Sequence, residues 1–297
     1  NAVGDQCDDN SRHPEYMVIV TVLLLTELKH TFTEIAQRMK NDEMITLAKF
    51  LAISGIILPM LPNENIIPDI NLTPYTIWLA TVVVSGISYL SYLLKRYVFR
   101  ESGVLVSGII GGLYSSTATI SVLARKSRNA HSQEASEYVA AMLLAVSMMF
   151  LRFMILILIF SSTIFTSIYP YLLIMAAVAA VVAWFIHTRR KRTPDADLVE
   201  EEDDSSNPLE FKVALIFAGL FVIFTVLTHY TLIYAGTGGL NLLSFVSGFS
   251  DITPFILNLL QGTGSVAATV VMACTMQAII SNIVVNMCYA LFFSGKQ

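Results

Sequence analysis

Residues 103–124 read GVLVSGIIGGLYSSTATISVLA, and this stretch decides the fold. It is apolar and about long enough to cross a bilayer as one helix. Glycines and the run Ser115-Ser116-Thr117 interrupt it, however, and basic residues lie on both sides of it, at 95–100 and at 125–128. Lys and Arg in short loops mark the cytoplasmic side of a membrane, so both ends are expected on that side. We therefore predict a re-entrant hairpin with about ten residues in each arm, which would reach roughly the middle of the bilayer. Two seven-residue arms around a wider turn, or a broken helix that spans the membrane, are the alternatives.

The composition of the whole chain is that of an integral membrane protein. Of 297 residues, 55% are hydrophobic and 13% are charged, and the mean hydropathy is +0.66. Soluble domains carry about 25% charged residues, so this chain has too few to cover a surface that faces water. The apolar residues fall in long runs, which predict an all-α membrane protein with about seven spanning helices. These runs are 16–28, 44–61, 75–94, 138–160, 169–186, 212–230 and 266–293.

A second apolar segment is also broken. Residues 240–260 contain Gly248, Asp251 and Pro254, and the loops around this segment lack the basic clusters seen elsewhere. We predict that it enters the membrane from the outside and returns.

The basic residues set the expected topology and domain organisation. Loops 95–102, 125–137 and 188–210 hold Lys and Arg and are expected in the cytoplasm, whereas 62–74, 161–169 and 231–239 hold none and are expected outside. Residues 1–40 are expected to form an extramembrane stretch, a short helix at 16–28 and an amphipathic interfacial helix at 31–40. Residues 41–297 are expected to form a single transmembrane domain.

The two broken segments belong to an internal repeat. Sliding the sequence by 136 residues places Gly112 on Gly248, Ser115 on Asp251 and Thr117 on Thr253. The order of a span, a broken segment and a long span with polar residues occurs in 71–160 and again in 207–294. In the topology above the two copies enter the membrane from opposite sides, which is the inverted repeat of many transporters. Two similar helical stretches without symmetry are the alternative.

Polar residues at the broken segments are candidate ligands. Irregular backbone at membrane depth is tolerated only where protein or a wet cavity satisfies it, so both segments are expected to line an internal cavity. The hydroxyl and carboxylate oxygens there suit a hard cation such as magnesium or sodium, with Asp251 as the candidate metal ligand. Free N–H groups at the starts of the half-helices suit an anion instead. The hydroxyls could also serve only to satisfy helix backbone. The candidates at the tips are Ser115, Ser116, Thr117, Asp251 and Thr253.

Two long spans carry further candidates. Arg152 lies well inside 138–160, where a charge is costly and usually has a partner in the protein interior. We expect that partner to be Asp251 or the carbonyls of 115–117, and the arginine to be either a structural anchor or a contact for the substrate. The last span contains Gln277, Asn282 and Asn286, which are expected to form a polar stripe. This stripe would line the pathway or join helices by hydrogen bonds.

Several short motifs resemble one known domain. They are GGLYSSTAT at 111–119 with LARK at 123–126, MFLR at 149–152, NPLEF at 207–211 and SGFSDI at 247–252. Together they resemble the C-terminal membrane domain, a domain of unknown function, of MgtC/SapB-family proteins. The resemblance implies a protein of the bacterial inner membrane with a link to magnesium homeostasis. Such domains often have a second Asp where Thr253 stands and a Lys near Asn286, so this chain departs from the pattern of a tight divalent site.

The function expected from these features is transport of a small ion or polar solute, with magnesium or another cation favoured. A bound magnesium or monovalent cation is the one cofactor considered, and the expected partners are the bilayer and either a second copy or another membrane protein. No nucleotide-binding loop, nucleophile elbow or paired catalytic carboxylates occur, so the protein is not expected to be an enzyme. No basic face suggests nucleic acid. One alternative is a regulatory or scaffolding subunit of the MgtC type that would pack its partner on the small residues of 108–112. A lipid-handling protein that holds a headgroup phosphate with Arg152 is another.

Overall fold

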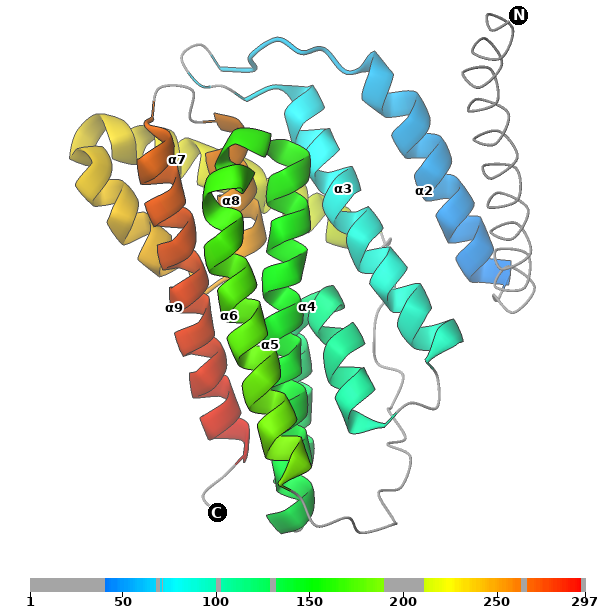
Figure 1. Cartoon of the computed structure of the whole chain (residues 1–297). Coiled ribbons are helices and arrows are strands. Elements are labelled where there is room, and N and C mark those ends of the chain that lie inside the picture. The colour runs from blue at the N-terminus through cyan, green and yellow to red at the C-terminus, as the bar shows by residue number, and fades with distance from the viewer. Residues whose placement is uncertain are drawn as a thin grey trace, which may run out of the picture. The chain divides into compact units, whose positions relative to one another are not determined.

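A computed structural model describes residues 41–67, 70, 72–99, 103–128, 132–189, 211–262 and 266–294, and all of its regular elements are helices (Figure 1). By length and apolar composition seven of the described helices could cross a membrane, which confirms the predicted fold class. One of the seven, at 104–127, is broken at Ser115 and is described below. In chain order the elements are α2 (Asn41–Met60), α3 (Pro74–Leu93), the π-helical turn η1 (Leu94–Val98), α4 (Val104–Ser127), α5 (Ser132–Phe160), α6 (Ser162–Thr188), α7 (Phe211–Ser247), α8 (Ile252–Gly262) and α9 (Ala268–Ser294). The predicted helices at 16–28 and 31–40, and most of the loop 188–210, lie outside the described residues.

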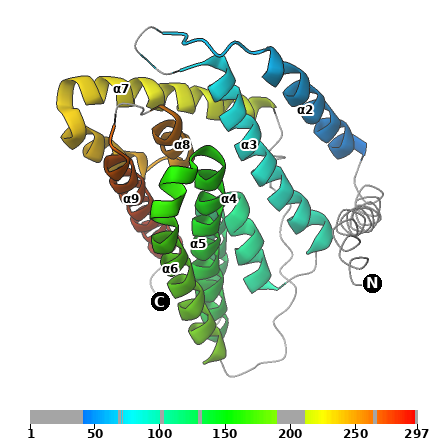
Figure 2. The same ribbon diagram turned by 45° about the horizontal axis from the view of Figure 1, so that its top comes forward.

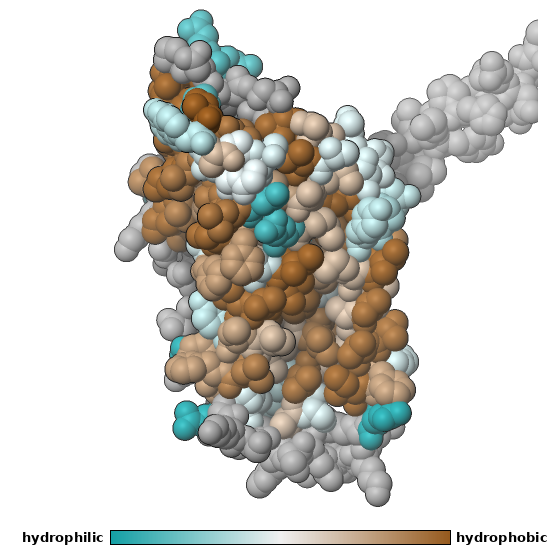
Figure 3. Space-filling model, turned by 90° about the vertical axis from the view of Figure 1, so that its left-hand side faces the viewer, coloured by the Kyte–Doolittle hydropathy of each residue, from teal (hydrophilic) through white to brown (hydrophobic). Residues whose placement is uncertain are grey.

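Residues 50–297 form one compact unit, separate from 1–49. Its face in Figure 3 shows a broad hydrophobic band with hydrophilic residues at its upper and lower edges and one small hydrophilic patch inside it. Such a band is what a surface in contact with lipid requires, because hydrocarbon cannot hydrogen-bond polar groups. The protein is therefore a multi-pass membrane protein.

Helix α4 folds back on itself at Ser115. The backbone of Ser115 is extended (φ −158°, ψ 105°), so the helix is divided into two arms. A Cβ placed on Gly111 would lie 2.5 Å from Oγ1 of Thr119, whereas eight residues of a continuous helix would separate these positions by about 12 Å. Val104 and Leu123 also belong to one buried cluster, although about 28 Å would separate them in a straight helix. The structure thus has the predicted re-entrant hairpin at 103–124.

The second broken segment is a hairpin too, with arms 237–247 and 252–262. Gly236 separates its first arm from the long part of α7, and its φ of +59° is a conformation that glycine adopts without steric cost. Pro254 lies in the first turn of α8, where the missing N–H is not needed by the helix. Helix α7 contacts α8 and α9, and Figure 2 shows the long part of α7 running across the bundle.

Two expected loops are shorter than predicted. The interval 161–169 is helical except for Ser161, which caps α6 with its side chain. The interval 231–239 is also helical apart from the kink at Gly236. The predictions stopped at polar residues in these intervals, but serine and threonine can bond to the backbone of the preceding turn and stay in a helix. Thr166 and Thr163 form such a pair, at 2.9 Å.

Helices α5 and α9 run in opposite directions. The hydroxyl of Ser127, at the end of α4, is 3.4 Å from that of Ser294, at the end of α9. Arg125 also lies over the ring of Phe293, 4.5 Å from its centre. Since α5 begins at Ser132, soon after α4 ends, its start lies at the same side as the end of α9, as Figure 1 also shows. This is the arrangement expected of an inverted repeat.

The apolar core lies mainly among α5, α6, α7, α8 and α9. Leu156 and Ile157 of α5, Leu172 of α6, and Phe255 and Leu257 of α8 are among its fully buried side chains. A hydrogen bond joins α5 to α6, in which the hydroxyl of Ser147 donates to the carbonyl of Ala176 at 2.9 Å. This core fixes α5, α8 and α9, the elements that carry most of the residues described next.

Candidate substrate cavity between the two hairpins

The break in α4 creates polar backbone groups inside the bundle. Ser115 caps the second arm, because its Oγ accepts from the N–H of Ala118 at 3.4 Å. The carbonyl of Tyr114 lies at the end of the first arm, where a helix exposes carbonyl groups that side chains can bond. Arg152 on α5 does so: its Nη1 donates to this carbonyl at 2.8 Å. The expected partner of Arg152 was a carbonyl of 115–117 or Asp251, and the structure shows the carbonyl of the preceding residue instead.

The tip of the second hairpin is held by α9. Asn282 donates from Nδ2 to the carbonyl of Gly248 at 3.2 Å, and Asn286 donates to Oδ1 of Asn282 at 3.1 Å. Asp251 caps α8, because its Oδ1 accepts from the N–H of Thr253 at 2.9 Å. Asp251 is exposed, and Thr253 is buried.

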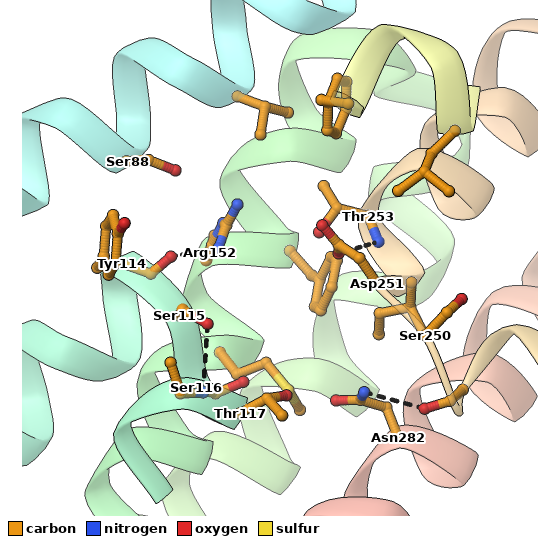
Figure 4. A pocket seen from close by; sticks show the side chains of 18 of the residues that line it. Ser88, Tyr114, Ser115, Ser116, Thr117, Arg152, Ser250, Asp251, Thr253 and Asn282 are labelled. Atoms are coloured by element: carbon orange, nitrogen blue, oxygen red, sulfur yellow. Dashed lines mark hydrogen bonds between the residues drawn. The ribbon is translucent and has the colours of Figure 1, made fainter. Parts of the chain in front are cut away.

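A cavity of about 450 Å³ lies between the two tips (Figure 4). This volume is within the range of sites that hold small molecules, roughly 300–1,000 Å³. Its polar lining includes Ser85 and Ser88 of α3, Tyr114, Ser115, Ser116 and Thr117 of α4, Arg152 of α5, Ser250, Asp251 and Thr253 of the second hairpin, and Asn282 and Tyr289 of α9.

The repeat relates the two sides of the cavity. Eight pairs of lining residues are separated by 136 positions in the sequence, the offset of the repeat. One close contact also recurs at this offset. A Cβ on Gly112 would lie 2.5 Å from Cα of Ala145, and a Cβ on Gly248 would meet the side chain of Ser281, the residue 136 after Ala145. The cavity therefore lies between the two repeats, as in transporters with inverted repeats. The eight pairs are Val84–Leu220, Gly112–Gly248, Tyr114–Ser250, Ser115–Asp251, Ser116–Ile252, Thr117–Thr253, Met149–Val285 and Phe153–Tyr289.

Arg152 and Asp251 are the two charged residues among those that line the cavity. Figure 4 shows Arg152 on the side of Tyr114 and Ser88, and Asp251 on the side of Thr253. Within the described part of the chain no ion pair joins the two, and the Arg152 Nε is buried without a hydrogen-bond partner. Both charges thus face a shared space without neutralising each other directly.

The structure brings together seven of the nine predicted site residues. Ser115, Ser116, Thr117, Arg152, Asp251, Thr253 and Asn282 line the cavity. Asn286 lies one turn behind Asn282 and orients it, while Gln277 is not part of the lining. Five residues of helix separate Gln277 from Asn282, which turns them to different faces, so the predicted stripe includes only Asn282 and Asn286. In the described ranges no group of three His, Cys, Asp or Glu side chains comes together, and Asp251 is the one carboxylate among the residues that line the cavity.

Sequence reasoning missed Ser85, Ser88, Tyr114, Ser250 and Tyr289, which also line the cavity. Serine inside an apolar helix is common, so Ser85 and Ser88 carried little signal by themselves. Tyr289 could have been found from the repeat, because the shift of 136 places Phe153 on it, one residue after Arg152.

Comparison with known proteins matches the part of the chain that holds the cavity. A family model described as Domain of unknown function (DUF4010) matches residues 82–294, which include every residue that lines the cavity. An uncharacterized protein of Aquifex aeolicus (strain VF5) is 26% identical over 205 residues, which cover 67% of this chain and 86% of that protein. No solved structure matches. Because the family model covers most of the chain, the protein belongs to the DUF4010 family.

Proposed function

We propose that this protein is a transporter that carries a small ion or polar solute across a membrane through the cavity between its two hairpins. The observation that carries the proposal is the joining of the two tips, 115–117 and 251–253, by one cavity. A protein whose polar tip residues were only structural would be expected to pack them against each other without leaving space.

The inverted arrangement supports alternating access. The tips come from re-entrant hairpins of opposite direction, and the lining residues form pairs related by the repeat. In such a protein one repeat can rock against the other and expose the same site to each side in turn. Each hairpin tip would open and close access to the cavity from one side of the membrane, since each hairpin reaches the cavity from a different side.

The lining favours a polar solute over a bare magnesium ion. Asp251 is the one carboxylate among the lining residues, and Arg152 would repel a cation from the same space. The association with MgtC/SapB proteins, magnesium homeostasis and the bacterial inner membrane is part of the proposal and rests on the motif resemblance. We also propose that the basic ends of η1, α4 and α6 lie in the cytoplasm.

The small residues of 108–112 do not support the alternative function of a regulatory or scaffolding subunit. It required the small residues of 108–112 to be free for a partner protein. Gly108 and Gly112 instead pack against the backbone of Ala141 and Ala145 within the chain, so closely that a Cβ on either would collide with it.

Uptake by purified protein in liposomes tests the proposal. Labelled magnesium, sodium, phosphate and small organic solutes are offered to the wild type, Arg152→Gln and Asp251→Asn, with Glu64→Gln, an exposed carboxylate outside the cavity, as the control. We expect saturable uptake of at least one solute that both cavity variants lose and the control keeps. Asparagine also caps helices well, so Asp251→Asn is expected to fold. Absence of uptake for the whole set by folded wild type would contradict transport and favour the regulatory function.

A further inference from the structure

The cavity holds one positive and one negative side chain that do not bond to each other. Arg152 uses one N–H group, on the carbonyl of Tyr114, out of the five that a guanidinium can donate. Asp251 uses one oxygen, on the N–H of Thr253, and its second oxygen has no partner among the described residues. Each charge therefore keeps bonding capacity for a ligand.

The two hairpins differ in the charge at the start of their second arms. Residues 116–127 begin with the neutral cap Ser115, so the positive end of that half-helix is not compensated by a carboxylate. Helix α8 begins with Asp251, whose negative charge compensates the equivalent end. The side of the cavity near Arg152 is therefore positive, and the side near Asp251 is negative.

Hydroxyl side chains on both sides of the cavity can bond to a ligand. Ser88 and Ser116 are each 8% exposed and Thr253 is 3% exposed, and all three line the cavity. None of their side chains has a hydrogen bond to another described residue, and Figure 4 shows the hydroxyl of Ser88 directed toward Arg152. Since these side chains line the cavity and their hydroxyls have no partner in the described protein, each hydroxyl can donate to or accept from a polar ligand there.

We propose that the cavity binds a small zwitterion of the α-amino acid class, an inference that rests on the proposed function. Its carboxylate would face Arg152, Ser116 and the start of residues 116–127, and its ammonium group would face Asp251. A simple anion would be repelled by Asp251 and a bare cation by Arg152, whereas a zwitterion satisfies both. The apolar part of the lining, which includes Met149, Phe153 and Leu220, leaves room for an uncharged side chain.

Binding to full-length protein in lipid nanodiscs tests the ligand class. The probes are glycine, L-alanine, L-leucine and L-phenylalanine, each compared with the analogue that lacks the amine and the analogue that lacks the carboxylate; for alanine these are propionate and ethylamine. Magnesium chloride is a further probe. Calorimetry measures Kd, and uptake of the same labelled probes into liposomes is measured in parallel.

We expect at least one amino acid to bind, with both of its analogues weaker by about tenfold or more, the size expected for one hydrogen bond to a charged group. Asp251→Asn should bind the amino acid and its carboxylate analogue about equally, and Arg152→Gln should bind the amino acid and its amine analogue about equally. Misfolding would not produce this exchange of selectivity, and Glu64→Gln should keep the wild-type pattern.

Two other outcomes would contradict the proposal that the ligand is a zwitterion. In the first, magnesium or an analogue with a single charge binds as tightly as every amino acid tested. In the second, no amino acid binds. Amino acid binding without uptake would support the ligand class and contradict transport. Uptake of magnesium or propionate without binding of amino acids would support transport and contradict the ligand class.

Discussion

Substitution of Gly112 by alanine tests how closely the first hairpin packs against α5. A Cβ at this position would lie 2.5 Å from Cα and 2.6 Å from the carbonyl oxygen of Ala145, both of which are backbone atoms. The first distance is 0.9 Å shorter than the 3.4 Å of ordinary contact, so α4 and α5 would have to separate. Overpacking of this kind costs about 1–3 kcal/mol.

The control has to remove the effect of helix propensity. Alanine is favoured over glycine by up to about 1 kcal/mol inside a helix, and this gain would hide part of the clash. Gly86 of α3 is also helical, and a Cβ there would meet nothing within 4 Å. The difference in unfolding free energy between Gly112→Ala and Gly86→Ala should therefore report the full clash, with Gly112→Ala less stable by about 1–3 kcal/mol.

The assay is unfolding by titration of a denaturing detergent into mixed micelles, followed by far-ultraviolet circular dichroism. Gly248→Ala repeats the test in the second hairpin, where the Cβ would meet Ser281 and, at 2.8 Å, the backbone nitrogen of Asn282. If Gly112→Ala is as stable as Gly86→Ala, α4 and α5 do not approach as closely as described, and the argument from the paired glycines fails.

Two further predictions concern the hairpins. Cysteines that replace Val104 and Leu123 should be cross-linked by a short bifunctional maleimide, because both residues belong to one buried cluster, whereas a straight helix would hold them about 28 Å apart. The cross-link is detected by cutting the chain between the two positions and testing by gel mobility whether the fragments stay joined. Asn258→Ala should lower the unfolding free energy by about 0.6 kcal/mol and by at most about 1.7 kcal/mol, the range for hydrogen bonds between membrane helices. This residue donates from Nδ2 to Thr228 at 2.8 Å and so joins α8 to α7.

The controls for these two predictions are also in the chain. Cysteines at Val104 and Val122 should link less efficiently, because Val122 is 47% exposed and lies outside that cluster. Equal linking of both pairs would show that Leu123 does not face Val104 specifically, and failure of Val104 to link to either position would contradict the hairpin. Thr166→Ala, on the exposed surface of α6, should stay within about 0.5 kcal/mol of wild type. An equal loss in Thr166→Ala and Asn258→Ala would show that the bond to Thr228 contributes nothing specific.

Much of the fold follows from local sequence. The long apolar runs required helices, and the basic residues on both sides of 103–124 required that segment to return to the side it came from. The repeat could also be read directly, since Gly112 and Gly248 share a position in both copies. Helix ends were less predictable, because threonines and serines between Ser161 and Tyr169 bond to the preceding turn and continue the helix.

The amino-acid sequence by itself determined the membrane class, the two hairpins and most of the polar residues at their tips, because hydropathy, glycine and flanking charge act over short stretches of chain. Only the tertiary structure decided which of those residues meet. The bond from Arg152 to the carbonyl of Tyr114, the separation of Arg152 from Asp251, and the position of Ser88 all depend on how α3, α4, α5 and α8 pack. These residues are far apart in the chain, and packing of side chains between helices, which no local pattern encodes, brings them to one cavity.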